Sequence, residues 1–344
     1  MTDDSSIAAR MRAALATPQL RLLAPVAVAM GALAVATRLS PAVGQARDAA
    51  RDLATGLLAF SPWLQDVLRP SIHYILLSPG FYCLLSGLLC LEILLPAQRE
   101  QRPLSPALLN DWLWALLQLS FFATAAGAFG GLLEHRLWPL LGLPVVPLGD
   151  HLPGPLHLLS VILIVDFLEW LHHLIRHKVP VLWAFHTIHH SQRSLNPMTD
   201  ARYHVVEYFV ASLVMFIPGT LLDLGAESMT AWLVARSWYT RFYHGNIRLT
   251  LGPLRYVLVT PQSHRIHHSR LPEHRDRNMG VLLCVWDRLF GTHSDDPRYP
   301  ETGIEDDQGF PHDRSARQVL SLRPLLMQQL YPFVYIARLR RAPR

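Results

Sequence analysis

Long apolar segments recur along this 344-residue chain and constrain its fold more than any other feature. Apolar residues make up 51% of the sequence and charged residues only 17%, whereas about 25% of a typical soluble domain is charged. Such segments are typical of helices that cross a lipid bilayer, because a helix bonds its backbone polar groups internally. The same composition excludes a largely disordered chain. We predict spans at residues 22–37, 72–96, 112–133, 156–171, 205–224 and 229–243.

The predicted spans indicate an all-α protein, a polytopic transmembrane bundle of about four to six helices with a cytoplasmic helical cap. Residues 40–70 are mixed and amphipathic, and they predict a connecting helix near the membrane interface. Trp112 and Trp114 begin the third predicted span, where indole rings are typical of interfacial anchors. We divide the chain into membrane-anchoring helices over 1–150, a histidine-rich domain that carries the site over 151–298, and a basic tail over 299–344.

The formal net charge of +5 comes from basic residues that flank the apolar segments. Orientation in a membrane explains this pattern better than a nucleic-acid partner does. The basic residues gather after the fourth and sixth predicted spans, and the positive-inside rule places that side in the cytoplasm. We therefore expect a multi-pass protein of a bacterial inner membrane whose site faces the cytoplasm. The residues counted are Arg176, Lys178, Arg193, Arg202, Arg255, Arg265, Arg270, Arg275 and Arg277.

Histidines are concentrated in one part of the chain, where residues 172–268 hold eleven of the eighteen. His173 and His177 are four positions apart, which puts both rings on one face of a helix. An H-x-x-H-H pattern occurs at residues 186–190 and again at 264–268, each time followed by serine. The three cysteines are too few and too scattered for a disulfide framework or a thiolate metal site. Imidazole is therefore the metal-binding chemistry that this sequence offers.

Neutral imidazole suits zinc, copper, iron or nickel. Because an ion takes about four protein ligands, the eight histidines of these three motifs predict two ions. No H-E-x-x-H motif is present, and a single E-x-x-H pair (Glu169, His172) is too little for a ferritin-like site. We expect His172, His274 and His293 not to bind metal. The candidate ligands are His173, His177, His186, His189, His190, His264, His267 and His268, with His244 as a ninth and His204 as either a ligand or a residue that orients one.

The residues around these histidines resemble the fatty acid hydroxylase/sterol desaturase superfamily of integral-membrane di-iron oxygenases. The resemblance covers about residues 155–295, and Met279 departs from the aromatic residue that family members often have at that point. The matching residues are Asp166-Phe167, His173-x-x-x-His177, Leu182-Trp183-x-Phe185-His186-x-x-His189-His190-Ser191, Leu195-Asn196, Thr199, Arg202-x-His204, Glu207, His244-x-Asn246, Thr260-Pro261-x-x-His264-Arg265-x-His267-His268-Ser269, Asp276-x-Asn278-x-Gly280 and Trp286-Asp287-Arg288-Leu289-Phe290-Gly291-Thr292.

The resemblance implies a helical membrane enzyme with two iron ions held by the eight motif histidines on the cytoplasmic face. His244 matches a histidine that the family places near the metals. Asp166 and Asn278 are expected to orient imidazoles through their second ring nitrogen. Asn246 and Asp276 belong to the same motifs and are further candidates for ligands or orienting residues.

The activity that this resemblance implies is O₂-dependent oxidation of an unactivated C–H bond in a lipid, whether a fatty acyl chain, a sterol-like ring or another lipophilic chain. Hydroxylation is our first hypothesis, because it needs only one hydrogen at the oxidant; desaturation by the same di-iron centre is the alternative. A histidine-based metal transporter is a more distant alternative, but it would favour ligands in the middle of its spans.

Electrons must come from another protein, since the sequence has neither a dinucleotide-binding glycine fingerprint nor a cysteine set for an iron–sulfur cluster. We expect a ferredoxin, a cytochrome or a flavoprotein reductase as donor. The basic segment 265–277 is a candidate docking site for an acidic donor, with a solvated loop as the alternative. The other expected partner is a lipophilic substrate that enters from the bilayer.

Overall fold

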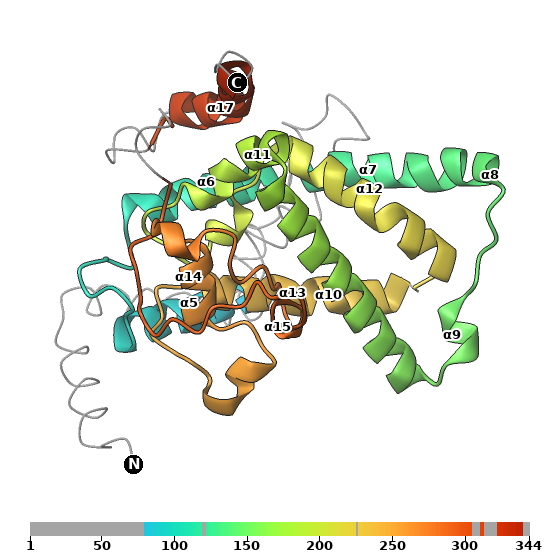
Figure 1. Ribbon diagram of the computed structural model, residues 1–344, viewed down its shortest axis with the longest axis horizontal. Helices are drawn as coiled ribbons and strands as arrows, with labels where there is room; N and C mark the ends of the chain where they lie inside the picture. Colours follow the sequence, from blue (N-terminus) through green and yellow to red (C-terminus); the bar gives the residue numbers. More distant parts are fainter. Residues whose placement is uncertain (1–78, 119–121, 225, 305–309, 313–321, 340–344) are drawn as a thin grey trace, which may run out of the picture.

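A computed structural model describes residues 79–118, 122–224, 226–304, 310–312 and 322–339 (Figure 1). The predicted span at 22–37, the predicted connecting helix at 40–70 and Arg340, Arg341 and Arg344 at the C-terminal end lie outside these residues. The described part is helical, with three isolated β-bridges and no longer strand, which confirms the all-α expectation. The helices are α5 (Pro79–Leu94), α6 (Pro106–Leu117), α7 (Ala123–Leu132), η2 (Leu133–Leu137), α8 (Trp138–Leu141), α9 (Leu148–His151), α10 (Gly154–Lys178), α11 (Pro180–His190), η3 (Thr199–Ala201), α12 (Val205–Leu222), α13 (Ala226–His244), η4 (Gly252–Tyr256), α14 (Pro261–His267), η5 (Pro272–His274), α15 (Val285–Phe290) and α17 (Leu322–Leu339).

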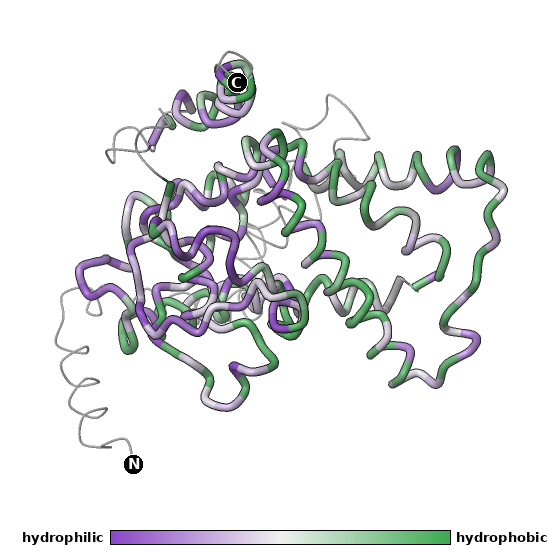
Figure 2. The backbone as a smooth tube through the Cα atoms, viewed as in Figure 1, coloured by the Kyte–Doolittle hydropathy of each residue, from purple (hydrophilic) through white to green (hydrophobic). Residues whose placement is uncertain are grey.

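Helices α7, α10, α12 and α13 extend to one side of the molecule, and Figure 2 shows that α7, α10 and α12 are mainly apolar. Among the described helices, α10 with 25 residues and α12 with 18 are long and apolar enough to cross a membrane. They coincide with the spans predicted at 156–171 and 205–224. Helix α13 covers the span predicted at 229–243, but it carries Arg236 and Arg241 and is too polar to qualify.

Within the described residues, the span predicted at 112–133 is divided between two helices. Its residues fall in α6, of 12 residues, and α7, of 10 residues, on either side of an undescribed stretch. Trp114 is fully buried rather than interfacial, and the guanidinium of Arg202 lies 5.7 Å from its ring centroid. Together with Phe81 and Ile188, Trp114 belongs to the largest apolar core of the described residues, so α6 is part of the body of the protein.

Asp111 in α6 organises the loop that follows α11. Its carboxylate accepts hydrogen bonds from Gln192, Asn196 and Thr199, and it pairs with Arg202 at 2.9 Å. All of these side chains are buried. Arg202, which the positive-inside count includes, is therefore a buried ion-pair partner within the protein.

The other half of the molecule is more polar and contains α5, α14, α15 and the segments between them (Figure 2). Arg265 in α14 is 2% exposed and donates to the carbonyl of Pro300. Helix α17 packs against α11, and Gln328 accepts a hydrogen bond from Arg202. The junction between the apolar and polar halves lies where α10 ends and α11 begins.

Candidate metal centre

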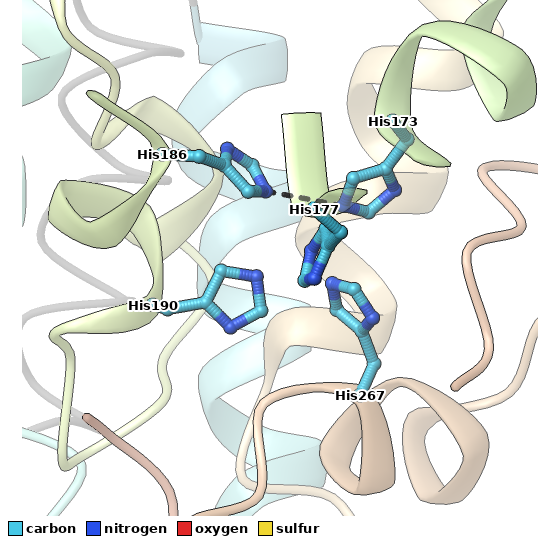
Figure 3. A group of neighbouring side chains, drawn as sticks. All are labelled: His173, His177, His186, His190 and His267. Carbon is cyan, nitrogen blue, oxygen red and sulfur yellow. Dashed lines mark hydrogen bonds between the residues drawn. The ribbon is translucent and has the colours of Figure 1, made fainter. Parts of the chain in front are cut away.

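Nine histidines meet at this junction in two groups whose candidate ligand nitrogens all lie within 4.8 Å of one another in each group. His204, His172, His274 and His293 lie outside both groups. Figure 3 shows five rings that turn toward one another from three separate helices. The five-histidine group contains His173, His177, His186, His190 and His267; the four-histidine group contains His189, His244, His264 and His268.

Local sequence explains why these rings converge. His173 and His177 share a face of the last two turns of α10, and α11 follows directly with Pro180 at its first turn. Helix α14 begins with Pro261 and a Thr260–Ser263 capping box, which fixes the start of the second H-x-x-H-H motif. Within each of the two H-x-x-H-H motifs, the rings divide between the two groups, whereas His173 and His177 lie in the same one.

The Nε2 atoms face one another at short distances. His264 Nε2 lies 2.9 Å from His244 Nε2 and 3.0 Å from His268 Nε2, and the Nε2 atoms of His173 and His186 are 3.2 Å apart. Two imidazole nitrogens that bind one ion at about 2.1 Å lie roughly 3.0–3.4 Å apart. The spacing therefore fits adjacent ligands of a single ion in each group.

Several ring nitrogens that point into the groups have no other partner. Nε2 of His177, His190 and His267 is buried without a hydrogen bond. A buried polar atom without a partner is costly, and a bound cation would satisfy it. Burial is the largest cause that lowers the pKa of His186, His189, His190, His264, His267 and His268 well below the ordinary value, and it lowers the pKa of His244 to about 4. The rings are thus neutral at physiological pH, as metal binding requires.

Residues 276–279 contact three rings of the five-histidine group at Nδ1, the ring nitrogen that does not face the other histidines. His173 Nδ1 donates to the carbonyl of Met279 at 2.9 Å, and His267 Nδ1 donates to the carbonyl of Arg277 at 2.9 Å. The carboxylate of Asp276 lies 3.4 Å from His177 Nδ1, and this contact lowers the pKa of Asp276. A proton on Nδ1 leaves the lone pair on Nε2, so these contacts set the tautomer that binds metal.

This segment adopts an unusual backbone. Asp276 and Asn278 have φ angles of 58° and 56°, in the left-handed region that Asp and Asn tolerate better than most residues. Asn278 fixes the turn by accepting from Ser294 N and donating to the carbonyl of Ser263. Asp287 accepts from the backbone N–H of Met279 at 2.8 Å.

A Gly280→Ala variant tests this support. The added Cβ would lie 2.7 Å from the carbonyl oxygen of Leu283, so the segment must shift and move the Met279 carbonyl away from His173. We expect a loss of about 1–3 kcal/mol in the free energy of unfolding and weaker metal retention, measured by thermal denaturation and metal analysis. Gly87→Ala is the control, because its Cβ meets nothing within 4 Å; equal behaviour of the two variants would contradict this role.

Glu207 is the main orienting residue that sequence reasoning missed. Its Oε2 accepts from His186 Nδ1 and from Arg176, each at 2.8 Å, while its Oε1 caps α12 through the N–H of His204. Glu207 stands in the matching motif, and the spacing His204-x-x-Glu207 before an apolar run resembles a capping box. No sequence pattern of this kind predicts that the backbone carbonyls of Arg277 and Met279 orient histidine rings.

Of the five further candidates, only Asp276 touches a ring of either group. Asp166 accepts from the N–H groups of Leu282 and Leu283 and so braces the loop before α15. Asn246 exchanges hydrogen bonds with the backbone of residue 98. His204 caps α12 and contacts the carbonyl of Gln329. The prediction that Asp166 and Asn278 bond directly to imidazoles is therefore wrong; both stabilise loops beside the centre.

A cavity of about 930 Å³ adjoins the centre. Arg176, Tyr203 and Glu207 line its inner end, and Tyr203 also stacks on His189 with ring centroids 4.5 Å apart. Phe216 and Leu233 line its apolar part, and Leu233 is 55% exposed, so the cavity reaches the surface. A cavity of this size accommodates part of a lipid-sized molecule.

Comparison with known proteins agrees with this geometry. Residues 158–292 match the family model for fatty acid hydroxylase. The chain is 34% identical to alkylglycerol monooxygenase of Danio rerio over 128 residues, which are 37% of this chain and 28% of that protein. It is 31% identical to the ornithine lipid hydroxylase OlsE of Rhizobium tropici over 157 residues, 45% of this chain and 47% of that one. The match thus spans less than half of each relative, and no solved structure matches. The segment that matches the fatty acid hydroxylase family model, residues 158–292, contains all nine clustered histidines.

Proposed function

We propose that the protein is a membrane-bound di-iron oxygenase that hydroxylates an unactivated C–H bond of a lipid. The observation that carries the proposal is the convergence of nine buried imidazoles in two groups beside a lipid-sized cavity. The family match and the names of the relatives, a monooxygenase and a lipid hydroxylase, support the same reaction class. Nitrogen ligation is compatible with iron.

In the proposed reaction, the lipid C–H, O₂, two electrons and two protons yield the alcohol and water. A di-iron centre supplies the oxidising power for this chemistry when it is bound. The histidines of the two groups hold it, and Glu207, Asp276 and the carbonyls of Arg277 and Met279 keep the Nδ1 positions occupied. The cavity walls exclude water and place one carbon of the substrate beside the centre.

The setting of the cavity supports a substrate taken from the bilayer. Helices α10 and α12, the two candidate membrane spans, both contribute to its lining. We propose a multi-pass protein of a bacterial inner membrane whose histidine centre lies at the cytoplasmic ends of these helices. A hydroxylated lipid remains our first expectation and a desaturated lipid the alternative.

The external electron donor is part of the proposal. The segment 265–277 is less basic at its surface than the sequence suggests, because Arg265 is buried and Glu273 pairs with Arg298 at 2.9 Å. A ferredoxin, cytochrome or flavoprotein donor that docks there would meet a surface of mixed charge. Docking would then depend on shape as much as on electrostatic attraction.

Turnover with isotopically labelled O₂ tests the reaction. The protein is purified without oxygen in detergent, reduced chemically, and mixed with bacterial lipid extract and labelled O₂. We expect one labelled oxygen atom in a product lipid. A product that has lost two hydrogens and gained no oxygen would identify a desaturase. A protein that reduces no O₂ and changes no lipid would refute the proposed function.

A further inference from the structure

Five buried polar atoms of residues that line the cavity have no hydrogen-bond partner: Gln118 Oε1, His172 Nε2, Arg176 Nε, Asp200 Oδ1 and Tyr208 Oη. Asp200 is only 4% exposed and His172 only 5%. Buried polar atoms of folded proteins nearly always have a partner, and a carboxylate is the most costly of them to leave without one. Their presence on one cavity wall indicates that a ligand completes them.

The side chains around this wall carry more negative than positive charge, and the two arginines form their ion pairs with carboxylates other than Asp200. Arg236 forms an ion pair with Glu169 at 2.8 Å, and Arg176 forms one with Glu207 at 2.8 Å. All four of these side chains line the cavity. Three carboxylates therefore face two arginines, and Asp200 shares the charge of Arg236 with Glu169, which holds the ion pair. A hydrogen-bond donor is the group that this environment favours.

The polar wall lies next to the histidine centre. Asp200 is part of η3, three residues before Tyr203, whose ring is stacked on His189 at an interplanar angle of 10°. Arg176 lies 5.6 Å from the centroid of the same ring. The rest of the lining includes the apolar side chains of Phe216 and Leu233. The cavity thus has a polar end at the centre and an apolar part leading away from it.

We propose that Asp200, with Tyr208 and His172, binds a hydrogen-bond-donating head group of the substrate, either a hydroxyl or a protonated amine. The lipid then enters head first, and oxidation occurs near its polar end rather than at the end of its tail. The inference rests on the proposed function and narrows its substrate class. A free carboxylate or a phosphate is disfavoured as head group, because the wall carries three carboxylates against two arginines, and each arginine already forms an ion pair.

Equilibrium binding of a matched series of sixteen-carbon probes to the iron-loaded protein in detergent tests this inference. The probes are hexadecylglycerol, its di-O-methyl ether, hexadecylamine and hexadecanoate. We expect the wild-type protein to bind hexadecylglycerol or hexadecylamine at least about tenfold more tightly than the ether, which lacks donors. Preference for the glycerol would identify a hydroxyl head group, and preference for the amine a charged one. Equal affinity for the ether, or tightest binding of hexadecanoate, would overturn the inference.

Two substitutions of Asp200 separate charge from hydrogen bonding. Asp200→Ala should lower the affinity for the favoured probe to that for the ether. Asp200→Asn should weaken binding of hexadecylamine but retain most of the binding of hexadecylglycerol, because an amide oxygen still accepts a hydrogen bond. Asp150→Asn, an exposed carboxylate in α9, is the charge control. A fall in iron content, or an equal loss for all probes, would show that Asp200 supports the centre instead and would overturn the inference.

Binding is measured without turnover, so the two proposals fail separately. If the protein oxidises no lipid but shows Asp200-dependent binding of a donor head group, the oxygenase proposal fails and the head-group site stands. If it oxidises lipids but binds the ether as tightly as hexadecylglycerol and hexadecylamine, the head-group site fails and the oxygenase stands.

Discussion

Replacement of His189 by alanine is expected to remove the metal ion of the four-histidine group and to lower the turnover rate more than about a hundredfold. His189 Nε2 lies 3.3 Å from His244 Nε2 in the middle of this group, and the ring is 1% exposed. Loss of one candidate ligand leaves three imidazoles in this group, which weakens its hold on the proposed ion and so the proposed oxidation. Metal analysis of the purified variant, with turnover on the wild-type substrate, measures both effects.

His274→Ala is the matched control for this variant. His274 is also a buried histidine, 2% exposed, but it bonds to Asp296 at 2.9 Å and lies outside both groups. We expect it to keep its metal and most of its activity. If His189→Ala retained the wild-type metal content, or if both variants lost metal alike, the four-histidine group would not be a specific metal site.

Glu207→Ala is expected to destabilise the protein by about 3–5 kcal/mol, because it leaves Arg176 as a buried charge without its partner. The same change removes the acceptor of His186 Nδ1 and the cap of α12. The variant should therefore lose affinity for metal in the five-histidine group as well as thermal stability. Thermal denaturation in detergent, with and without added iron, separates the two losses.

Glu169→Ala provides the comparison. It breaks a similar ion pair, with Arg236 at 2.8 Å, but its carboxylate pairs with no histidine of the two groups. We expect a loss of stability with retention of metal. Wild-type stability and metal content in Glu207→Ala would contradict the role assigned to this carboxylate.

The histidines could be found from the sequence because helical periodicity brings residues three and four positions apart to one face. The division into groups could not be found in this way. His189 and His190 are neighbours in α11 yet belong to different groups, and His244 joins its group from the end of α13. Group membership depends on how the four helices pack, which spacing along the chain does not reveal.

The orienting contacts were harder to predict than the ligands. The backbone carbonyls of residues 277 and 279 accept hydrogen bonds from Nδ1 of His267 and His173. Because every residue type has a backbone carbonyl, the sequence does not reveal such contacts. Asp166 and Asn278 have the residue types of orienting groups, but they bond to backbone in neighbouring loops. Asp276 alone among the predicted carboxylates contacts a ring, because the left-handed backbone at its position turns it toward α10.

Burial shows which of the membrane expectations the described residues support. Hydropathy along the chain does not distinguish an apolar helix in lipid from one in a protein core, and Trp114 belongs to the second kind. The positive-inside count likewise included Arg202, although Asp111 neutralises it from 91 positions away in the sequence. The two spans that agree with the structure are α10 and α12, the described helices that are long and apolar enough to cross a membrane.

Metal analysis of the wild-type protein tests the central claim most directly. Protein purified without chelators from cells grown with iron, zinc and copper is analysed by mass spectrometry for metal content per chain. We expect two iron ions per chain, one for each histidine group. A single zinc ion per chain, or no bound metal after iron loading, would contradict the di-iron account.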